Sequence, residues 1–118
     1  MSEPATPPTS LLVACLCAAW CRVCESYQQE FAQLAQRYPQ VRFRWVDVED
    51  EAALVDDLDV ETFPTLLIGR GEHLAFAGPV PPQLGSAERL ISAALDGGGQ
   101  PGTDPAAQAL LRRLQAGG

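Results

Sequence analysis

The pattern of hydrophobic and polar residues predicts a β-α-β start for this chain. Residues 11–17 form a continuous apolar run that is too short for a typical helix and fits a strand covered on both faces. Between residues 23 and 38, apolar side chains recur every three or four positions, which predicts an amphipathic helix that Pro39 closes. The segment 41–48 is aromatic and β-branched and predicts a second strand.

The following residues predict shorter elements. Asp50 can cap a short helix. Residues 65–68 and 73–77 are two short runs around a glycine-containing turn, which is typical of an antiparallel hairpin. A further amphipathic helix is expected from residue 83 to residue 95. The expected order is therefore β-α-β-α-β-β-α, in the α/β class.

The two ends of the chain depart from this pattern. Residues 1–10 contain three prolines and no apolar periodicity, so we expect an extended tail. Residues 11–96 would form one domain, and 97–118 a Gly-rich linker with a short C-terminal helix. One side of that helix would present Leu110, Leu111 and Leu114. Because isolated helices of this length are marginal in water, these leucines are expected to cover apolar surface.

Composition and charge exclude several classes of partner. The 118 residues include fifteen acidic and eight basic side chains, for a formal charge of −7. This charge repels nucleic-acid phosphates and anionic membrane surfaces. No apolar stretch reaches the roughly 18 residues that a membrane span needs. We expect neither a nucleic-acid nor a membrane partner.

The segment Leu12-Val13-Ala14-Cys15 resembles the cleavage box of a bacterial lipoprotein signal. A secretory signal needs a positively charged start and an apolar segment of about 7 to 15 residues. Residues 1–10 contain neither Lys nor Arg, so we expect a cytoplasmic protein. In a reducing cytosol, four cysteines favour catalysis or metal binding over structural disulfides.

Cys21 and Cys24 are the strongest candidates for chemistry. Two cysteines three positions apart at a helix start are close enough to alternate between a dithiol and a disulfide. The helix N-terminus and the cationic Arg22 favour a thiolate at Cys21, which makes it the nucleophile. Cys24 would be the resolving thiol. The pair predicts thiol–disulfide exchange, in a direction that the sequence does not fix.

Cys15 and Cys17 are expected to be small hydrophobes, because they alternate onto one face of a buried strand. An alternative is that all four cysteines bind zinc, since they lie within ten residues. Structural zinc sites normally bring two separated ligand pairs together, which a strand interior does not easily allow. We therefore favour a site without metal or other cofactor.

The motif Trp20-Cys21-Arg22-Val23-Cys24, together with Phe63-Pro64, resembles the thioredoxin family, whose Trp-Cys-x-x-Cys motif faces a cis proline. The resemblance implies a thioredoxin-like fold with a central mixed four-stranded sheet. It also implies a cis bond before Pro64 that places the Phe63 backbone beside the sulfurs, to pair with an extended substrate. Asp47 and Gly78 are further matches.

The same resemblance implies the partners of the site. These would be protein substrates with disulfides or dithiols, recycled by a thioredoxin-reductase-type enzyme or a glutathione-based system. A large aromatic side chain beside the nucleophile offers an apolar platform for a substrate chain. The expected substrate-binding residues are Trp20, Arg22, Val23, Phe63, Pro64 and Gly78.

The chain also departs from the family pattern. Residues 1–10 are too short for the first strand and helix of a full-length thioredoxin, so the C-terminal leucines would cover the surface left open. Cys15 takes the place of the usual buried carboxylate six residues ahead of Cys21, so proton transfer at Cys24 needs another group or water. Arg22-Val23 replaces the usual Gly-Pro, and the mid-helix proline is absent.

These departures leave a second function open, a non-enzymatic thioredoxin-fold module that binds a protein chain along Phe63-Pro64 or acts as an assembly factor. A reversible bridge between Cys21 and Cys24 would distinguish the oxidoreductase from such a module.

Overall fold

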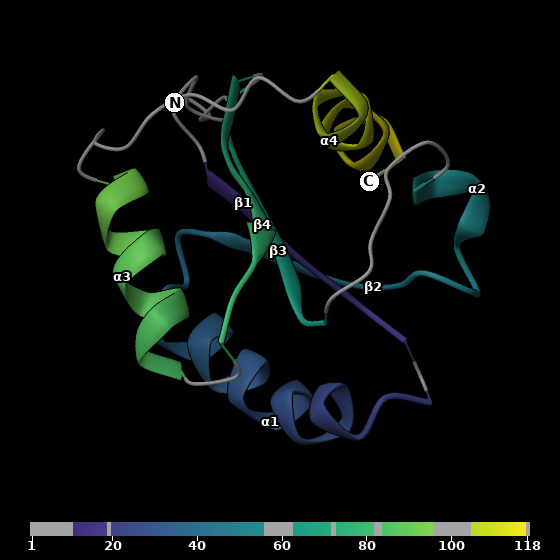
Figure 1. Ribbon diagram of the computed structural model, residues 1–118. Coiled ribbons are helices and arrows are strands. Elements are labelled where there is room, and N and C mark those ends of the chain that lie inside the picture. Colours follow the sequence, from purple (N-terminus) through teal and green to yellow (C-terminus); the bar gives the residue numbers. More distant parts are fainter. Residues whose placement is uncertain are drawn as a thin grey trace.

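The computed structural model describes residues 11–18, 20–55, 63–71, 73–81, 84–95 and 105–117. Their elements follow in the order β1-α1-β2-α2-β3-β4-α3-α4 (Figure 1). The strands are β1 (Leu11–Cys17), β2 (Arg42–Asp47), β3 (Thr65–Arg70) and β4 (His73–Pro79). The helices are α1 (Arg22–Arg37), α2 (Ala52–Val55), α3 (Leu84–Leu95) and α4 (Pro105–Gly117). The expected extended tail, 1–10, lies outside the described residues, as does the expected Gly-rich linker before α4.

The strands form one four-stranded sheet in the order β2-β1-β3-β4. Strand β1 pairs parallel with β2 and antiparallel with β3, and β3 pairs antiparallel with β4. The mixed sheet expected from the sequence is therefore confirmed. Every residue of β1 is buried, because this strand has neighbours on both edges and helices over both faces.

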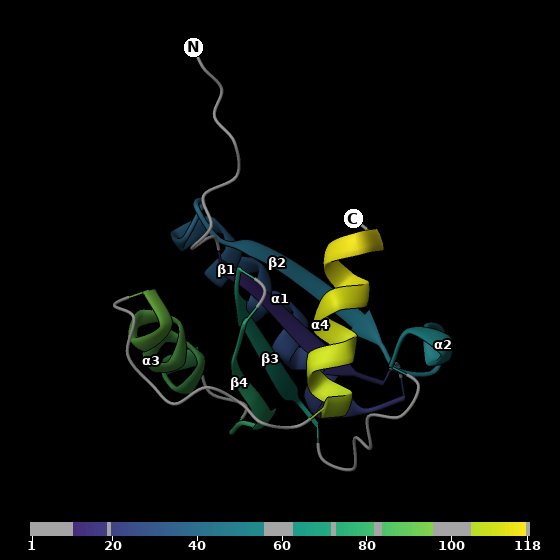
Figure 2. The same ribbon diagram turned by 90° about the horizontal axis from the view of Figure 1, so that it is seen from above.

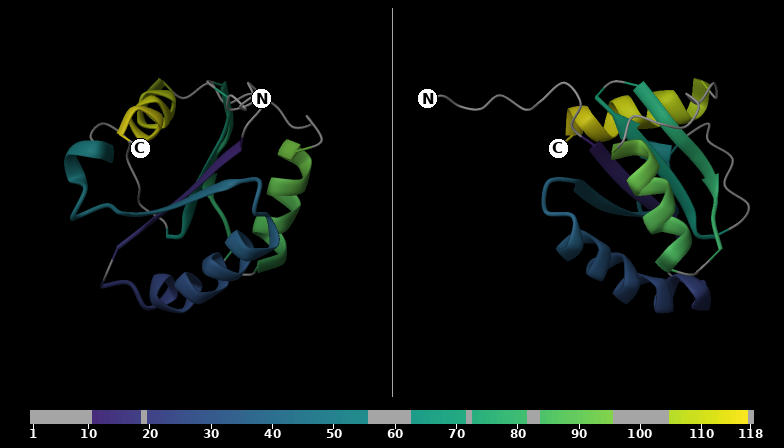
Figure 3. Two further views of the ribbon diagram at one scale, coloured as in Figure 1. Left: turned by 180° about the vertical axis from the view of Figure 1, so that it is seen from behind. Right: turned by 90° about the vertical axis from the view of Figure 1, so that its left-hand side faces the viewer.

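Successive residues of β1 belong to two different hydrophobic cores, one on each face of the sheet. On one face, the first core joins β1 to the apolar sides of α1 and α3. Its β1 members are Leu11, Val13, Cys15 and Cys17. On the other face, the second core joins β1 to α4. Its β1 members are Leu12, Ala14 and Leu16. The right-hand view of Figure 3 shows the resulting layers, with α4 on one side of the sheet and α1 and α3 on the other.

Helix α4 lies across the second face of the sheet (Figure 2). Its buried side chains are Ala107, Leu110, Leu111 and Leu114. The expectation that these leucines cover apolar surface is confirmed. Strand β3 approaches the helix closely at Gly69, where an added Cβ would collide with the Leu111 side chain. A glycine here lets α4 lie directly on the sheet.

The hairpin strands extend beyond the ranges that the sequence predicts. Arg70 pairs with His73, so that β3 and β4 run up to the turn itself. Gly71 takes a φ of 58° there, a left-handed conformation that glycine adopts without strain.

None of the helices in the described part of the chain has the length and the apolar character that a membrane span requires.

Candidate redox site

Cys21 lies at the junction between the end of β1 and the start of α1. It is the N-cap of α1, with an extended backbone, and its carbonyl accepts a hydrogen bond from the Glu25 amide at 3.1 Å. The Cys21 amide donates to the Ala18 carbonyl at 3.0 Å, which closes the preceding turn. The Cys21 thiol is partly exposed and unbonded. It therefore sits at the helix N-terminus, where the first amides lack intrahelical partners and favour negative charge.

Cys24 lies one turn further along α1 and faces the sheet, with only 2% of its surface exposed. In the structure its sulfur is bonded to Cys17 at the end of β1. Their Cα atoms are 5.7 Å apart, within the range of ordinary disulfides. The pairing of Cys21 with Cys24 remains a prediction, since Cys24 has a different partner here.

The expectation that Cys17 is an inert small hydrophobe is wrong in this structure, because Cys17 is bonded. The signal that could have found this partner is the alternation of β1, which turns Cys17 toward the same side of the sheet as α1. Cys24 is on the buried face of α1, so the two sulfurs approach each other across the layers.

Cys15 is a free thiol in the middle of β1, with none of its surface exposed. Its sulfur lies 3.9 Å from the Cys17 sulfur. Burial raises the pKa of the Cys15 thiol to about 12, because a thiolate would lose its hydration. Cys15 is therefore neutral at physiological pH and cannot act as an ionised group in the place of the usual carboxylate.

All four cysteines belong to the described part of the chain, which allows the zinc alternative to be examined. Among the described residues, no group of three or more His, Cys, Asp or Glu side chains is arranged to hold a metal ion. The geometry around Cys24 instead favours sulfur–sulfur chemistry.

The structure brings the cysteine motif and the proline loop together. The Phe63–Pro64 peptide bond is cis, and the Pro64 carbonyl accepts a hydrogen bond from the Val80 amide at 3.0 Å. The Trp20 and Phe63 rings pack edge to face with centroids 5.7 Å apart. Residues from two distant segments therefore form one surface next to Cys21.

Large apolar side chains are exposed around Cys21. Trp20 exposes 66% of its surface and Val23 exposes 40%, and Arg22 is also exposed. Gly78 lies on β4, opposite Leu66 of β3. Among the described residues, a Cβ at Gly78 would meet only the Phe76 ring, at an ordinary distance of 3.5 Å, so these neighbours do not require glycine there.

Cys24 lines a pocket of about 310 Å³. Asp47 lines it, and its carboxylate accepts hydrogen bonds from the Glu49 and Asp50 amides at 2.9 and 3.1 Å. Among the residues that the structure describes, the lining is Ala18, Cys24, Glu25, Gln28, Trp45, Asp47 and Asp50. The sequence identified Asp47 only as a family match, whereas the structure places it and Cys24 in the same acidic pocket.

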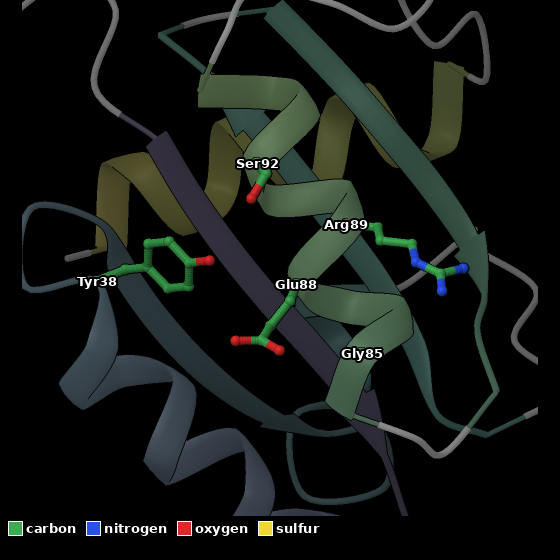
Figure 4. Close-up of a pocket in the computed structure, with 5 residues that line it drawn as sticks. All are labelled: Tyr38, Gly85, Glu88, Arg89 and Ser92. Atoms are coloured by element: carbon green, nitrogen blue, oxygen red, sulfur yellow. The ribbon is translucent and has the colours of Figure 1, made fainter.

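A second pocket, of about 520 Å³, lies at the other end of α1 (Figure 4). It is formed by Tyr38 and one side of α3, where Glu88 also forms an ion pair with Arg37 of α1. In Figure 4 the Arg89 side chain points away from Tyr38. None of the described residues that line this pocket lines the pocket at Cys24, so the two pockets are distinct.

The sequence model of the family described as Thioredoxin matches residues 5–82, which are more than half of the chain. The chain belongs to the thioredoxin family. The family resemblance expected from the sequence is thereby confirmed.

Individual thioredoxins show the same relationship. "Thioredoxin-3, mitochondrial" of Saccharomyces cerevisiae is 33% identical over 57 residues, which make up 48% of this chain and 45% of that protein. The match thus spans less than half the length of this curated relative.

Solved structures agree over more of the chain. Oxidized mitochondrial thioredoxin 3 from Saccharomyces cerevisiae superposes with a TM-score of 0.64 at 26% identity, covering 74% of this chain and 81% of that chain. A structure on thiol resolution in a yeast mitochondrial 1-Cys peroxiredoxin via glutathione/thioredoxin systems gives a TM-score of 0.60 at 25% identity. It covers 77% of this chain and 82% of that chain. The thioredoxin fold expected from the sequence is confirmed.

Proposed function

We propose that this chain is a thiol–disulfide oxidoreductase that exchanges disulfides with protein substrates through Cys21 and Cys24. The observation that carries the proposal is the position of Cys21. Its thiol is partly exposed at the N-terminus of α1, and a second cysteine follows one turn later. Membership of the thioredoxin family supports the same chemistry.

In the proposed cycle, with Cys24 reduced, the Cys21 thiolate attacks one sulfur of a substrate disulfide. The other substrate sulfur leaves as a thiolate, and a mixed disulfide joins Cys21 to the substrate. The Cys24 thiolate then attacks the Cys21 sulfur and releases the second substrate thiolate. Two electrons pass to the substrate, and a Cys21–Cys24 disulfide remains. The reverse steps would oxidise a substrate dithiol.

The surface around Cys21 suits a polypeptide substrate. Trp20 and Val23 supply exposed apolar area, and Phe63 packs against Trp20. We propose that an extended substrate segment lies along this surface and pairs with the Phe63 backbone beside Pro64. Arg22 and Gly78 would border the same segment. The combination of apolar contact and backbone pairing accepts many sequences, which is appropriate for a general oxidoreductase.

Asp47 is the group that we propose for proton transfer at Cys24. The usual buried carboxylate is replaced by Cys15, whose neutral thiol does not perform that role. Asp47 and Cys24 line the same pocket, and the two backbone amides fix the Asp47 carboxylate. A water molecule in this pocket would connect the two groups, so that Cys24 could lose its proton before it attacks the mixed disulfide.

We propose that a thioredoxin-reductase-type enzyme recycles the site, with a glutathione-based system as the alternative. The structural similarity to a protein of glutathione/thioredoxin systems supports both. The cytoplasmic location expected from the sequence stays a prediction.

Insulin disulfide reduction with dithiothreitol as the electron source tests the proposal. We expect turnover by the wild type and its loss in Cys21→Ser, because the nucleophile is removed. Cys15→Ala is the matched control and should retain turnover, since Cys15 is buried away from substrate. Full activity in Cys21→Ser would contradict the proposal.

A non-enzymatic binding module is the second candidate, and the Cys17–Cys24 bond favours it, because this bond leaves Cys21 without a resolving thiol. The surface formed by Trp20 and Phe63 would then bind a protein chain without turnover. Equilibration in glutathione buffers separates the two functions. The module predicts that a reversible Cys21–Cys24 bridge forms at no ratio of reduced to oxidised glutathione.

A further inference from the structure

Cys24 has two candidate partners, one in its own helix and one in the sheet. Cys21 precedes it by one turn of α1, the spacing that allows a small-ring disulfide. Cys17 reaches it from the end of β1, with the two Cα atoms 5.7 Å apart and the sulfurs bonded. One sulfur cannot form both bonds at once, so Cys21 and Cys17 compete for Cys24.

We propose that Cys17 is a third redox-active cysteine, which takes Cys24 out of the Cys21–Cys24 disulfide and leaves Cys21 as a single free thiol, the single-thiol form of the site. This inference rests on the proposed function, because it assigns a further residue to the same exchange chemistry.

The conversion is an internal disulfide exchange that needs no external oxidant. The Cys17 thiol loses its proton, and the resulting thiolate attacks the Cys24 sulfur of the Cys21–Cys24 disulfide. A Cys17–Cys24 bond forms, the Cys21–Cys24 bond breaks, and Cys21 leaves as a thiolate that can take up a proton. The number of disulfides and electrons in the chain is unchanged.

The burial of the three sulfurs determines what each form can do. Cys17 and Cys24 expose 0% and 2% of their surfaces, so outside thiols have little access to the bond between them. Cys21 remains partly exposed. In the single-thiol form, a substrate captured by Cys21 would stay attached as a mixed disulfide, because Cys24 is not free to release it. A small thiol such as glutathione would then have to resolve it.

Cys15 provides a matched control for Cys17. Both lie on β1, face the same core and are fully buried. Two residues along a strand span about 6.6 Å, so Cys15 lies further back under the helix than Cys17. Cys15 is a free thiol. A change at Cys15 therefore removes a buried thiol without removing the partner of Cys24.

The test is disulfide mapping in full-length wild type, Cys17→Ala, Cys15→Ala and Cys21→Ser. Each protein is equilibrated in glutathione redox buffers, quenched with acid, alkylated and digested. Cleavage after Trp20 and after Arg22 places Cys17, Cys21 and Cys24 on separate peptides, which mass spectrometry then identifies. We expect both bonds in wild type and in Cys15→Ala, only Cys21–Cys24 in Cys17→Ala, and Cys17–Cys24 in Cys21→Ser.

The result in Cys21→Ser is decisive, because this substitution is at a partly exposed position and leaves the core intact. The inference would be overturned if Cys24 of this variant remains a thiol or a glutathione adduct at every glutathione ratio, with Cys17 free. So would a wild type that contains only the Cys21–Cys24 bond. Circular dichroism confirms that each variant is folded.

A second measurement separates this inference from the proposed function. One outcome rejects only the role of Cys17 as a third redox-active cysteine. In that outcome Cys17→Ala forms the Cys21–Cys24 bond and reduces insulin, whereas Cys21→Ser never forms the Cys17–Cys24 bond. If both bonds form as expected but neither wild type nor Cys17→Ala reduces insulin, the proposed oxidoreductase function fails, and the exchange between the three cysteines stands.

Discussion

Trp20 and Phe63 pack edge to face, with ring centroids 5.7 Å apart and an angle of 82° between the ring planes. Trp20 belongs to the cysteine motif, and Phe63 precedes the cis proline. The contact therefore aligns the nucleophile's loop with the loop proposed to pair with substrate. Aromatic contacts of this kind contribute about 0.5–1.5 kcal/mol beyond the area that they bury.

Trp20→Ala is expected to weaken substrate binding more than it weakens the fold. Trp20 is 66% exposed, so we expect stability to fall by no more than about 1.5 kcal/mol. The KM for insulin should rise several-fold, because an apolar platform beside Cys21 is removed. Leu95→Ala is the control, since Leu95 is a large exposed side chain on α3. An unchanged KM in Trp20→Ala would contradict the role of this surface.

Asp47→Asn should slow the release of substrate from the mixed disulfide. The amide keeps an oxygen that can accept from the Glu49 and Asp50 amides but cannot take a proton. Turnover should fall by about 10-fold or more, and the trapped Cys21 mixed disulfide should accumulate. Asp50 lines the same pocket, so Asp50→Asn is the comparison. Equal effects of the two substitutions would indicate a general loss of negative charge instead.

Cys15 should make the folded state less stable at high pH. Burial raises its pKa to about 12, whereas the unfolded chain ionises near 9, so between these values the native state holds a proton that the unfolded state has lost. Stability is unaffected below pH 9 and falls as pH rises, by at most about 1.4 kcal/mol per pH unit. Urea unfolding at about pH 8 and about pH 10 should show a smaller decrease in Cys15→Ala than in wild type.

The comparison with Cys15→Ala measures what this thiol contributes, directly and through its smaller effect on the pKa of Tyr27. Burial also raises the pKa of Tyr27, with smaller contributions from Cys15 and Glu30, so Tyr27 lowers stability in the same direction above its ordinary value of 10.0. Parallel pH profiles in the two proteins would contradict the assignment to Cys15.

Gly69→Ala is expected to destabilise the protein by about 1–3 kcal/mol, because the new methyl group would overlap Leu111 of α4. Leu111 is fully buried, so Leu111→Ala alone should cost about 2–5 kcal/mol through the cavity that it leaves. In the double variant, the methyl group added at position 69 would partly fill that cavity. Denaturant unfolding should therefore give a combined loss smaller than the sum, and strict additivity would argue against direct contact.

Deletion of residues 100–118 should lower the melting temperature sharply. Leu110, Leu111 and Leu114 are all buried against the sheet, and each contributes about 1.5–3 kcal/mol of apolar burial. Arg112→Ala, at an exposed position of α4, is the control and should change stability by no more than about 0.5 kcal/mol. An unchanged melting temperature in the deletion variant would reject a stabilising role for α4.

Periodicity predicted most of the fold, because it reports which face of an element is buried. The segment 41–48 was correctly predicted as a strand, and the leucines of α4 were correctly expected to be buried. Contacts between elements were harder to predict from the sequence. The pattern turned Cys17 toward α1 but did not show that its position along β1 lies under Cys24. Likewise, nothing local to Gly69 indicates that Leu111, far along the chain, lies against it.

The alternation of β1 also means that its two roles depend on its register. These roles are to turn Cys17 toward α1 and to pack against α4. Inserting one residue near its start would exchange the sets that face α1 and α4. Cys15 and Cys17 would turn toward α4, and Leu16 would take a place beneath the redox helix. The disulfide chemistry and the packing of the C-terminal helix therefore depend on the same alternation of β1 residues. A shift of the strand by one residue would change both.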